Sequence, residues 1–294
     1  RGGRSNEIAY MVDGVPMTDA YNGGISVQIE NDNIQELQVI SGTFNAEYGK
    51  ALTGVVNMVT KDGGNNFEGF INFYSGDHTT SDSIFPNLDS YRIDNDYSIS
   101  ANLSGPIIPG LVTFYSSARI NRSAGWLNGF NTFTMYGDTI FYDNNNNHYR
   151  DNNEPLKSPQ YESMNWYDSW STQNKITFRL RPMTRLKINT IFNSGTSQGY
   201  DHNRQMTHEG RKKNFDYGAF IGFNLSHSFS ALSFIDLYLT EYTHKFHSYL
   251  FEEPLDPRYI TPDSLFWAHI EGKLPDEVIN KYGSEVNYFP QYTV

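Results

Sequence analysis

Apolar and polar residues alternate along most of the chain after position 66. In residues 97–104 the odd positions carry Tyr, Ile, Ala and Leu, and the even positions carry Ser and Asn. Successive side chains of a β-strand point to opposite faces, so this pattern predicts a strand with one apolar and one polar face. Residues 215–226 repeat the pattern, with Phe220 as an apolar exception on the polar face.

Seven segments of this kind can be placed, each with an alternating stretch of about 9 to 11 residues, which is the length of a tilted membrane-spanning strand. The connections after the second, fourth and sixth segments are short, and the others are long and polar. We expect consecutive antiparallel neighbours in a curved sheet, with the short turns at one rim and the long loops at the other. The segments lie near residues 67–75, 96–105, 111–122, 170–181, 184–194, 215–228 and 232–246.

The sorting of loops by length favours an outer-membrane β-barrel, in which short periplasmic turns alternate with long extracellular loops. A secreted β-sandwich that binds carbohydrate would show similar strands, but it has no reason to sort its loops by end. An odd number of strands does not close a simple antiparallel barrel. Plugged outer-membrane transporters have 22 strands, so most of the wall would lie outside this sequence.

Residues 1–66 follow a different pattern. Residues 8–12 form a short apolar run that ends in the turn sequence Asp13-Gly14-Val15-Pro16. Residues 34–40 alternate like a half-buried strand, and residues 54–60 form a run rich in β-branched residues that could be buried on both faces. This region is therefore expected to be the last part of a compact domain that leads into the large sheet.

The composition narrows the function classes. The chain has 294 residues, is 15% aromatic and 19% charged, has a mean hydropathy of −0.57 and contains no cysteine. The absence of cysteine excludes disulfides, thiol catalysis and cysteine-based zinc sites. A net charge of −11 argues against a nucleic-acid partner, whose phosphates require a basic face.

Two strings near the N-terminus resemble a known family. RGGRSNEIAYMVDGVPMTD at residues 1–19 and IQELQVISGTFNAEYGKALTGVVNMVTKDGG at residues 34–64 resemble the C-terminal half of the plug domain of TonB-dependent outer-membrane receptors, closest to the Oar-like branch. The resemblance implies a mainly β protein: the C-terminal part of an α/β plug at residues 1–66, then the N-terminal part of a large barrel with long extracellular loops at residues 67–294. The chain would then be a fragment of a longer protein.

The function implied by this resemblance is import of a scarce ligand, such as a siderophore, peptide or glycan, across the bacterial outer membrane. Its partners would be the TonB energy-coupling protein, which would bind a segment outside this sequence, and outer-membrane lipid and lipopolysaccharide. An outer-membrane adhesion or structural protein on the same scaffold is the alternative. We expect no enzymatic activity: Gly195 to Gly199 match the G-x-S-x-G pattern of a serine nucleophile, but no amphipathic helix follows.

One loop sequence points to a metal ion. DNNNNHYRDNNE, residues 143–154, places oxygen-bearing groups at the positions that bind calcium in an EF-hand-type loop, although His148 stands where glycine normally makes the sharp turn. The alternative is a solvated Asn/Asp loop. The predicted ligands of a structural Ca²⁺ ion are Asp143, Asn145, Asn147, Tyr149 through its carbonyl oxygen, Asp151 and Glu154.

Other polar residues of the long loops are expected to lie at the surface. This applies to four histidines, His202, His208, His244 and His247, which are predicted to occupy surface or membrane-rim positions rather than a metal site. A basic cluster at residues 204–213 that includes Arg211 is expected to be solvated, although it could meet an anionic ligand or lipopolysaccharide. The acidic tail after Leu250 is expected to form a large extracellular loop with a short helix near residues 276–282.

Overall fold

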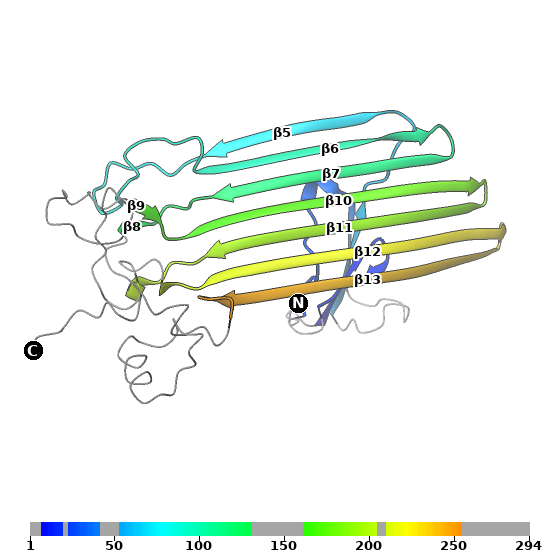
Figure 1. Cartoon of the computed structure of the whole chain (residues 1–294). Helices are drawn as coiled ribbons and strands as arrows, with labels where there is room; N and C mark the ends of the chain where they lie inside the picture. Colours follow the sequence, from blue (N-terminus) through cyan, green and yellow to red (C-terminus); the bar gives the residue numbers. More distant parts are fainter. Residues whose placement is uncertain (1–6, 20–22, 42–52, 131–160, 205–209, 254–294) are drawn as a thin grey trace, which may run out of the picture.

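The computed structural model describes residues 7–19, 23–41, 53–130, 161–204 and 210–253. A four-stranded sheet with strand order β2-β1-β4-β3 lies against one face of a seven-stranded sheet with order β13-β12-β11-β10-β7-β6-β5 (Figure 1). The changeover falls between Thr60 and Glu68. None of the helices in the described ranges is long and apolar enough to cross a membrane.

The small sheet contains the strands predicted for the N-terminal region. It is built from β1 (Ile8–Val12), β2 (Val15–Pro16), β3 (Ile34–Ser41) and β4 (Gly54–Thr60), with a 3₁₀ turn at Asn31–Asn33 before β3. β1 pairs in parallel with β4 and antiparallel with β2, and β3 pairs antiparallel with β4. The predicted turn joins β1 and β2, with positive φ at Asp13 (49°) and Gly14 (83°), and these are residue types that tolerate that conformation.

The large sheet confirms the predicted order of the seven segments, because every neighbouring pair is antiparallel. A separate two-stranded sheet, which was not predicted, is formed by β8 (Asn128–Phe130) and β9 (Tyr161–Ser163). These two strands come between β7 and β10 in the order of the chain. The strands are β5 (Glu68–Gly76), β6 (Asp96–Ile108), β7 (Val112–Ser123), β10 (Trp166–Arg181), β11 (Thr184–Gln198), β12 (Lys213–Ser230) and β13 (Ser233–Tyr249).

Several strands are longer than their predicted segments. β10 begins at Trp166 and β13 ends at Tyr249, because ladder hydrogen bonds continue beyond the stretch in which apolar and polar residues alternate. The tight turns β6–β7, β10–β11 and β12–β13 lie at one end of the sheet, on the right in Figure 1. The described parts of the long connections lie at the other end, as the loop lengths predict.

The two faces of the large sheet differ in chemistry. The apolar face points away from the small sheet, and its side chains are exposed, as in Leu103 (50%), Trp170 (46%) and Phe223 (41%). The small sheet covers the central part of the polar face and buries Ser117, Gln173 and Asn189 among others. We call these the outer and inner faces. A polar inside and an apolar outside are typical of a membrane barrel.

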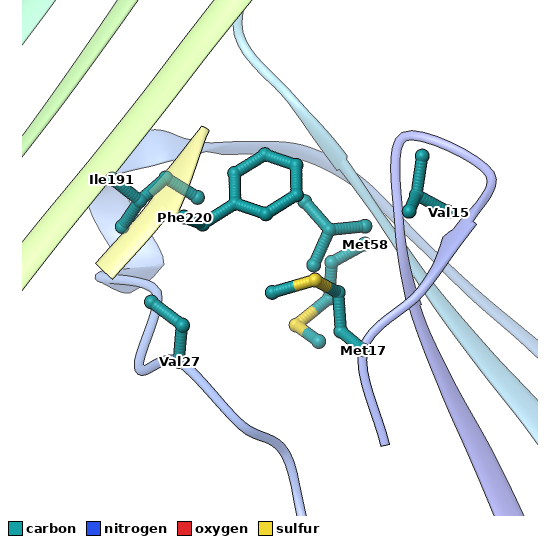
Figure 2. Close-up of a cluster of buried hydrophobic side chains, with 7 residues drawn as sticks. Val15, Met17, Val27, Met58, Ile191 and Phe220 are labelled. Carbon is teal, nitrogen blue, oxygen red and sulfur yellow. The ribbon is translucent and has the colours of Figure 1, made fainter. Parts of the chain in front are cut away.

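The exception on the polar face of β12 has a physical explanation. Phe220 is 2% exposed and packs, together with Ile191 of β11, against an apolar cluster of the small sheet (Figure 2). Burial removes these apolar surfaces from water and so favours attachment of the small sheet to the seven-stranded sheet, which we call the wall. The cluster residues contributed by the N-terminal region are Val12, Val15, Met17, Val27 and Met58.

Candidate functional site

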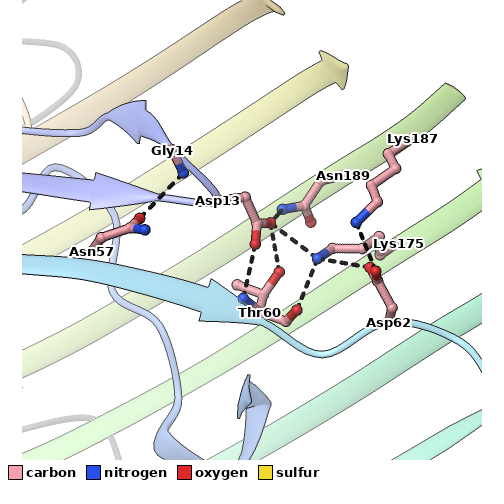
Figure 3. A network of polar contacts seen from close by, with 8 residues as sticks. All are labelled: Asp13, Gly14, Asn57, Thr60, Asp62, Lys175, Lys187 and Asn189. Carbon is pink, nitrogen blue, oxygen red and sulfur yellow. Dashed lines mark hydrogen bonds and ion pairs between the residues drawn. The ribbon is translucent and has the colours of Figure 1, made fainter. Parts of the chain in front are cut away.

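The most buried polar contact between the two sheets centres on Lys175 of β10, whose side chain is 1% exposed. Its Nζ lies 3.0 Å from Oδ2 of Asp13, 3.1 Å from Oδ1 of Asp62 and 3.0 Å from the carbonyl oxygen of Thr60, to which it donates (Figure 3). An ammonium group has three donors and no acceptor, so these oxygens satisfy it fully. We call this group the Lys175 anchor.

The sequence builds the Lys175 anchor from the ends of two strands of the small sheet. Asp13 follows β1, and its carboxylate accepts hydrogen bonds from the backbone N–H (2.9 Å) and the hydroxyl (2.7 Å) of Thr60 at the end of β4. Asn189 of β11 also donates to Asp13, at 3.1 Å. Because β1 and β4 are parallel neighbours, their carboxyl ends meet at the same edge, which brings Asp13 and Thr60 together facing the wall.

Asp62 is shared between two lysines of the wall. Besides Lys175, it pairs with Nζ of Lys187 on β11 at 2.6 Å. Burial alone would raise the pKa of the Asp62 carboxyl, but the two lysines outweigh burial, so its pKa is lowered from its usual value. The carboxylate therefore stays ionised at neutral pH and binds the wall by charge.

A second anchor lies nearer the end with the long loops. Glu30, in the loop before β3, accepts a hydrogen bond from Nη1 of Arg119 on β7 at 2.9 Å and another from the hydroxyl of Ser171 on β10 at 2.9 Å. Close to it, the hydroxyl of Tyr115 donates to the side-chain oxygen of Asn33 at 2.9 Å. The Glu30 carboxylate is 12% exposed, so this pair is much less screened by solvent than a surface salt bridge.

A histidine forms a third contact, which the sequence reading missed. His244 of β13 faces inward and lies between Asp19 of the small-sheet region and Asp216 of β12, at 3.0 Å from each. Its expected surface position is therefore wrong for this residue. His247, three positions further along the strand, lies on the opposite face, as strand periodicity requires.

The interface differs from a dry hydrophobic core. Gln173 is 1% exposed, yet neither atom of its amide has a hydrogen-bond partner among the described residues, and the same holds for the hydroxyls of Ser117 and Thr177. The attachment thus combines a few ionic anchors with a largely polar surface.

Several other candidate residues from the sequence lie outside the described residues. The proposed calcium ligands at residues 143–154 lie outside the described residues, as do His208 and nearly all of the acidic tail. His202 is exposed, as expected. The described part of the chain contains no group of three or more His, Cys, Asp or Glu side chains that could hold a metal ion.

Arg211 contradicts the expectation of a solvated basic loop. It is 4% exposed, and its Nη1 donates to the carbonyl oxygens of Met164 and of Gly199 (3.3 Å). Burial lowers its pKa, which Glu162 and Asp201 partly oppose. Arg211 therefore links the loop before β12 to the backbone just after β9 and just after β11. No local sequence pattern reveals this role.

The anchors could have been located only in part from the sequence. Lys175 and Lys187 interrupt predicted strands as cations on the polar face, and a charge that faces a barrel interior needs a partner. Asp13 belongs to the turn string quoted above. Nothing in the sequence pairs these residues, because they are separated by more than a hundred positions.

Comparisons with known proteins agree on one family. Residues 1–56 match the family model of the TonB-dependent receptor plug domain. Over 122 residues the chain is 29% identical to the TonB-dependent transporter Oar of Myxococcus xanthus, an alignment that covers 39% of this chain and 12% of Oar.

Two solved structures have a similar fold. The siderophore receptor PirA of Pseudomonas aeruginosa matches with a TM-score of 0.51 and 12% identity, over 83% of this chain and 34% of PirA. The outer membrane transporter YddB of Escherichia coli matches with a TM-score of 0.51 and 10% identity, over 80% of this chain and 31% of YddB. At such low identity these matches show the fold alone, and the chain spans about a third of each of these two structures.

Proposed function

We propose, from the premise that this chain is part of a TonB-dependent outer-membrane receptor, that the whole protein imports a scarce ligand across the outer membrane. The observation that carries the proposal is the docking of the N-terminal sheet on the polar inner face of the seven-stranded wall through Lys175 and Arg119. A plug held by a few ionic anchors blocks the barrel and can still be displaced when force is applied.

The two sheets would belong to two different domains of the whole protein. Residues 1–66 would form the C-terminal part of the plug, and residues 67–294 the N-terminal part of the barrel. TonB would bind a segment outside this sequence and transmit energy to the plug. The exposed apolar outer face, with Trp170 and Phe223, would contact outer-membrane lipid, and the loop end would meet lipopolysaccharide.

An uptake assay tests the proposal. A strain that lacks the full-length gene is compared with the parent and with a strain that lacks TonB, across labelled ferric siderophores, peptides and oligosaccharides. Transport predicts at least one ligand whose accumulation falls in both mutants. If surface attachment is lost in the receptor mutant alone, and no ligand depends on TonB, the protein is an adhesion protein on the same scaffold.

The calcium site is a second proposal and rests on the sequence of residues 143–154 alone. Three carboxylates, Asp143, Asp151 and Glu154, would bind Ca²⁺ together with Asn145, Asn147 and the Tyr149 carbonyl. So few carboxylates favour weak binding, on the order of 10⁻⁴ to 10⁻³ M. Calorimetric titration of the purified receptor with calcium should release heat that an Asp143→Ala, Glu154→Ala double variant does not; identical traces would reject the site.

A further inference from the structure

His244 links three separate parts of the molecule. Its Nδ1 lies 3.0 Å from Oδ2 of Asp19 in the plug, and its Nε2 lies 3.0 Å from Oδ2 of Asp216 on β12. The ring belongs to β13, where its direct partner across the strand pair is Gly218. Because Gly218 has no side chain, the imidazole can reach diagonally to Asp216, two residues earlier on β12.

Asp19 is part of a tight hairpin of the plug, formed by residues 17–19 and 23–26. The backbone N–H of Asp19 donates to the carbonyl of Gly24 at 2.8 Å, and that of Ser26 donates to the carbonyl of Met17 at 2.8 Å. We call this segment the plug hairpin. Through Asp19, His244 holds the plug hairpin against the wall at the same level of the strands as the Glu30 anchor. Arg119, Ser171 and His244 belong to one cross-strand row, which passes through Asn193 and Gly218.

The two contacts of His244 fix the number of protons that its ring must carry. An ionised carboxylate only accepts hydrogen bonds, and a neutral imidazole has one N–H donor and one acceptor nitrogen. Two carboxylates at 3.0 Å on both nitrogens therefore require one proton more than a neutral ring supplies. In water imidazole retains a proton to higher pH than a carboxyl group does, so the extra proton belongs on His244.

We propose that His244 is a positioning residue of the transport cycle: as an imidazolium it latches the plug hairpin to the barrel wall, and loss of its proton releases the hairpin. When the ring is neutral, one nitrogen presents a lone pair to a carboxylate oxygen, and that half of the bridge becomes repulsive. The described charged groups that act on the ring are Asp19 and Asp216. The neighbours of His244 on its own face of β13 are the aromatic residues Tyr242 and Phe246.

The inference deepens the proposed plug function and can be tested separately from it. Hydrogen–deuterium exchange of the plug hairpin is measured in the full-length receptor at pH 5.5 and pH 8.5, and variants are compared with the wild type at the same pH so that the intrinsic exchange rate cancels. Exchange reports on the hairpin and not on transport, so a failed uptake assay would leave this result unchanged.

Four proteins distinguish a proton-dependent latch from a structural contact. At pH 5.5 the hairpin of the His244→Gln variant should exchange roughly three- to tenfold faster than wild type, the effect of one lost charge-assisted hydrogen bond at a partly exposed site, and at pH 8.5 the two should be equal. In Asp216→Asn the amide can donate to a neutral ring, so protection should persist at both pH values. His247→Gln, on the opposite face, should behave as wild type.

Two results would overturn the latch. One is equal exchange of wild type and His244→Gln at pH 5.5. The other is loss of protection at pH 8.5 in Asp216→Asn to the same extent as in wild type. Exchange of β6 and β7, which do not contact His244, serves in each variant as the control for an intact wall.

Discussion

Substitution of Lys175 by Met should weaken the attachment of the plug more than the loss of any other charged side chain at the interface. The variant keeps most of the apolar stem of the side chain and removes its charge. It leaves Asp13 without its cationic partner, although Thr60 and Asn189 still donate to that carboxylate. Asp62 retains Lys187 at 2.6 Å.

The magnitude follows from burial. Removal of one partner of a buried ion pair costs about 3–5 kcal/mol. The side chains of Asp13 and Asp62 are 26% and 36% exposed, so water screens part of the loss, and we expect the lower end of that range, about 3 kcal/mol. With a urea dependence of about 1–3 kcal/mol per M, the unfolding midpoint of the plug should fall by about 1–3 M.

Pulse proteolysis of the purified full-length receptor in increasing urea measures that midpoint. Resistance of the barrel to denaturation by detergent without heating shows in parallel that the barrel itself remains folded. Lys187→Met removes a more exposed cation from the same carboxylate and should cost less than about 1 kcal/mol. Lys245→Met, on the outer face of β13, should leave the plug unchanged. Equal midpoints for Lys175→Met and wild type would refute the assignment of Lys175 as the main anchor.

Three further changes test the interface. Phe220→Ala should lower plug stability by about 3 kcal/mol or more through a cavity against the plug, measured by the same urea assay, whereas Phe223→Ala on the outer face should not affect the plug. Glu30→Gln should speed hydrogen exchange of β3, because it leaves the Arg119 guanidinium without its carboxylate. Acid should also loosen the plug: the folded pKa of Asp62 is lowered from 3.8, so its contribution is complete above that value and is lost as the pH falls below it, which plug proteolysis between pH 5 and 2 would show.

The two titratable contacts have opposite dependences on pH. The Asp62 contribution disappears in acid, whereas the His244 latch requires a proton and weakens as the pH rises. They also lie at different levels of the strands, with Lys187 closer to the short turns and His244 closer to the long loops. The plug is therefore attached most completely in a mildly acidic to neutral range.

Strand positions were predictable because the period-2 pattern reports directly on which face of a strand is apolar and which is polar. Residues 97–104 and 215–226 identify their strands without any tertiary information, and the loop lengths give the sorting of the two rims. Even Phe220 is informative in retrospect, since an apolar residue on a polar face marks the place where the plug makes its apolar contact.

The interface was much less predictable, for a physical reason. The partners of Lys175 lie on segments that are remote in sequence, and their contact depends on how the small sheet is oriented on the wall. His244 illustrates the limit: an H-x-x-H spacing in a strand indicates two opposite faces, but not that one of them meets Asp19. Arg211 likewise appears in a basic cluster, and its burial depends on the fold of neighbouring loops.

Single-channel conductance gives the most direct test of the claim that these residues plug a barrel. The full-length receptor is reconstituted in a planar bilayer beside a version that lacks the plug and beside the Lys175→Met variant. The account predicts a closed wild type, an open pore without the plug, and openings of Lys175→Met that appear at lower urea concentration than those of wild type. A plug-free barrel that inserts and remains closed, or a wild type that conducts without urea, would contradict it.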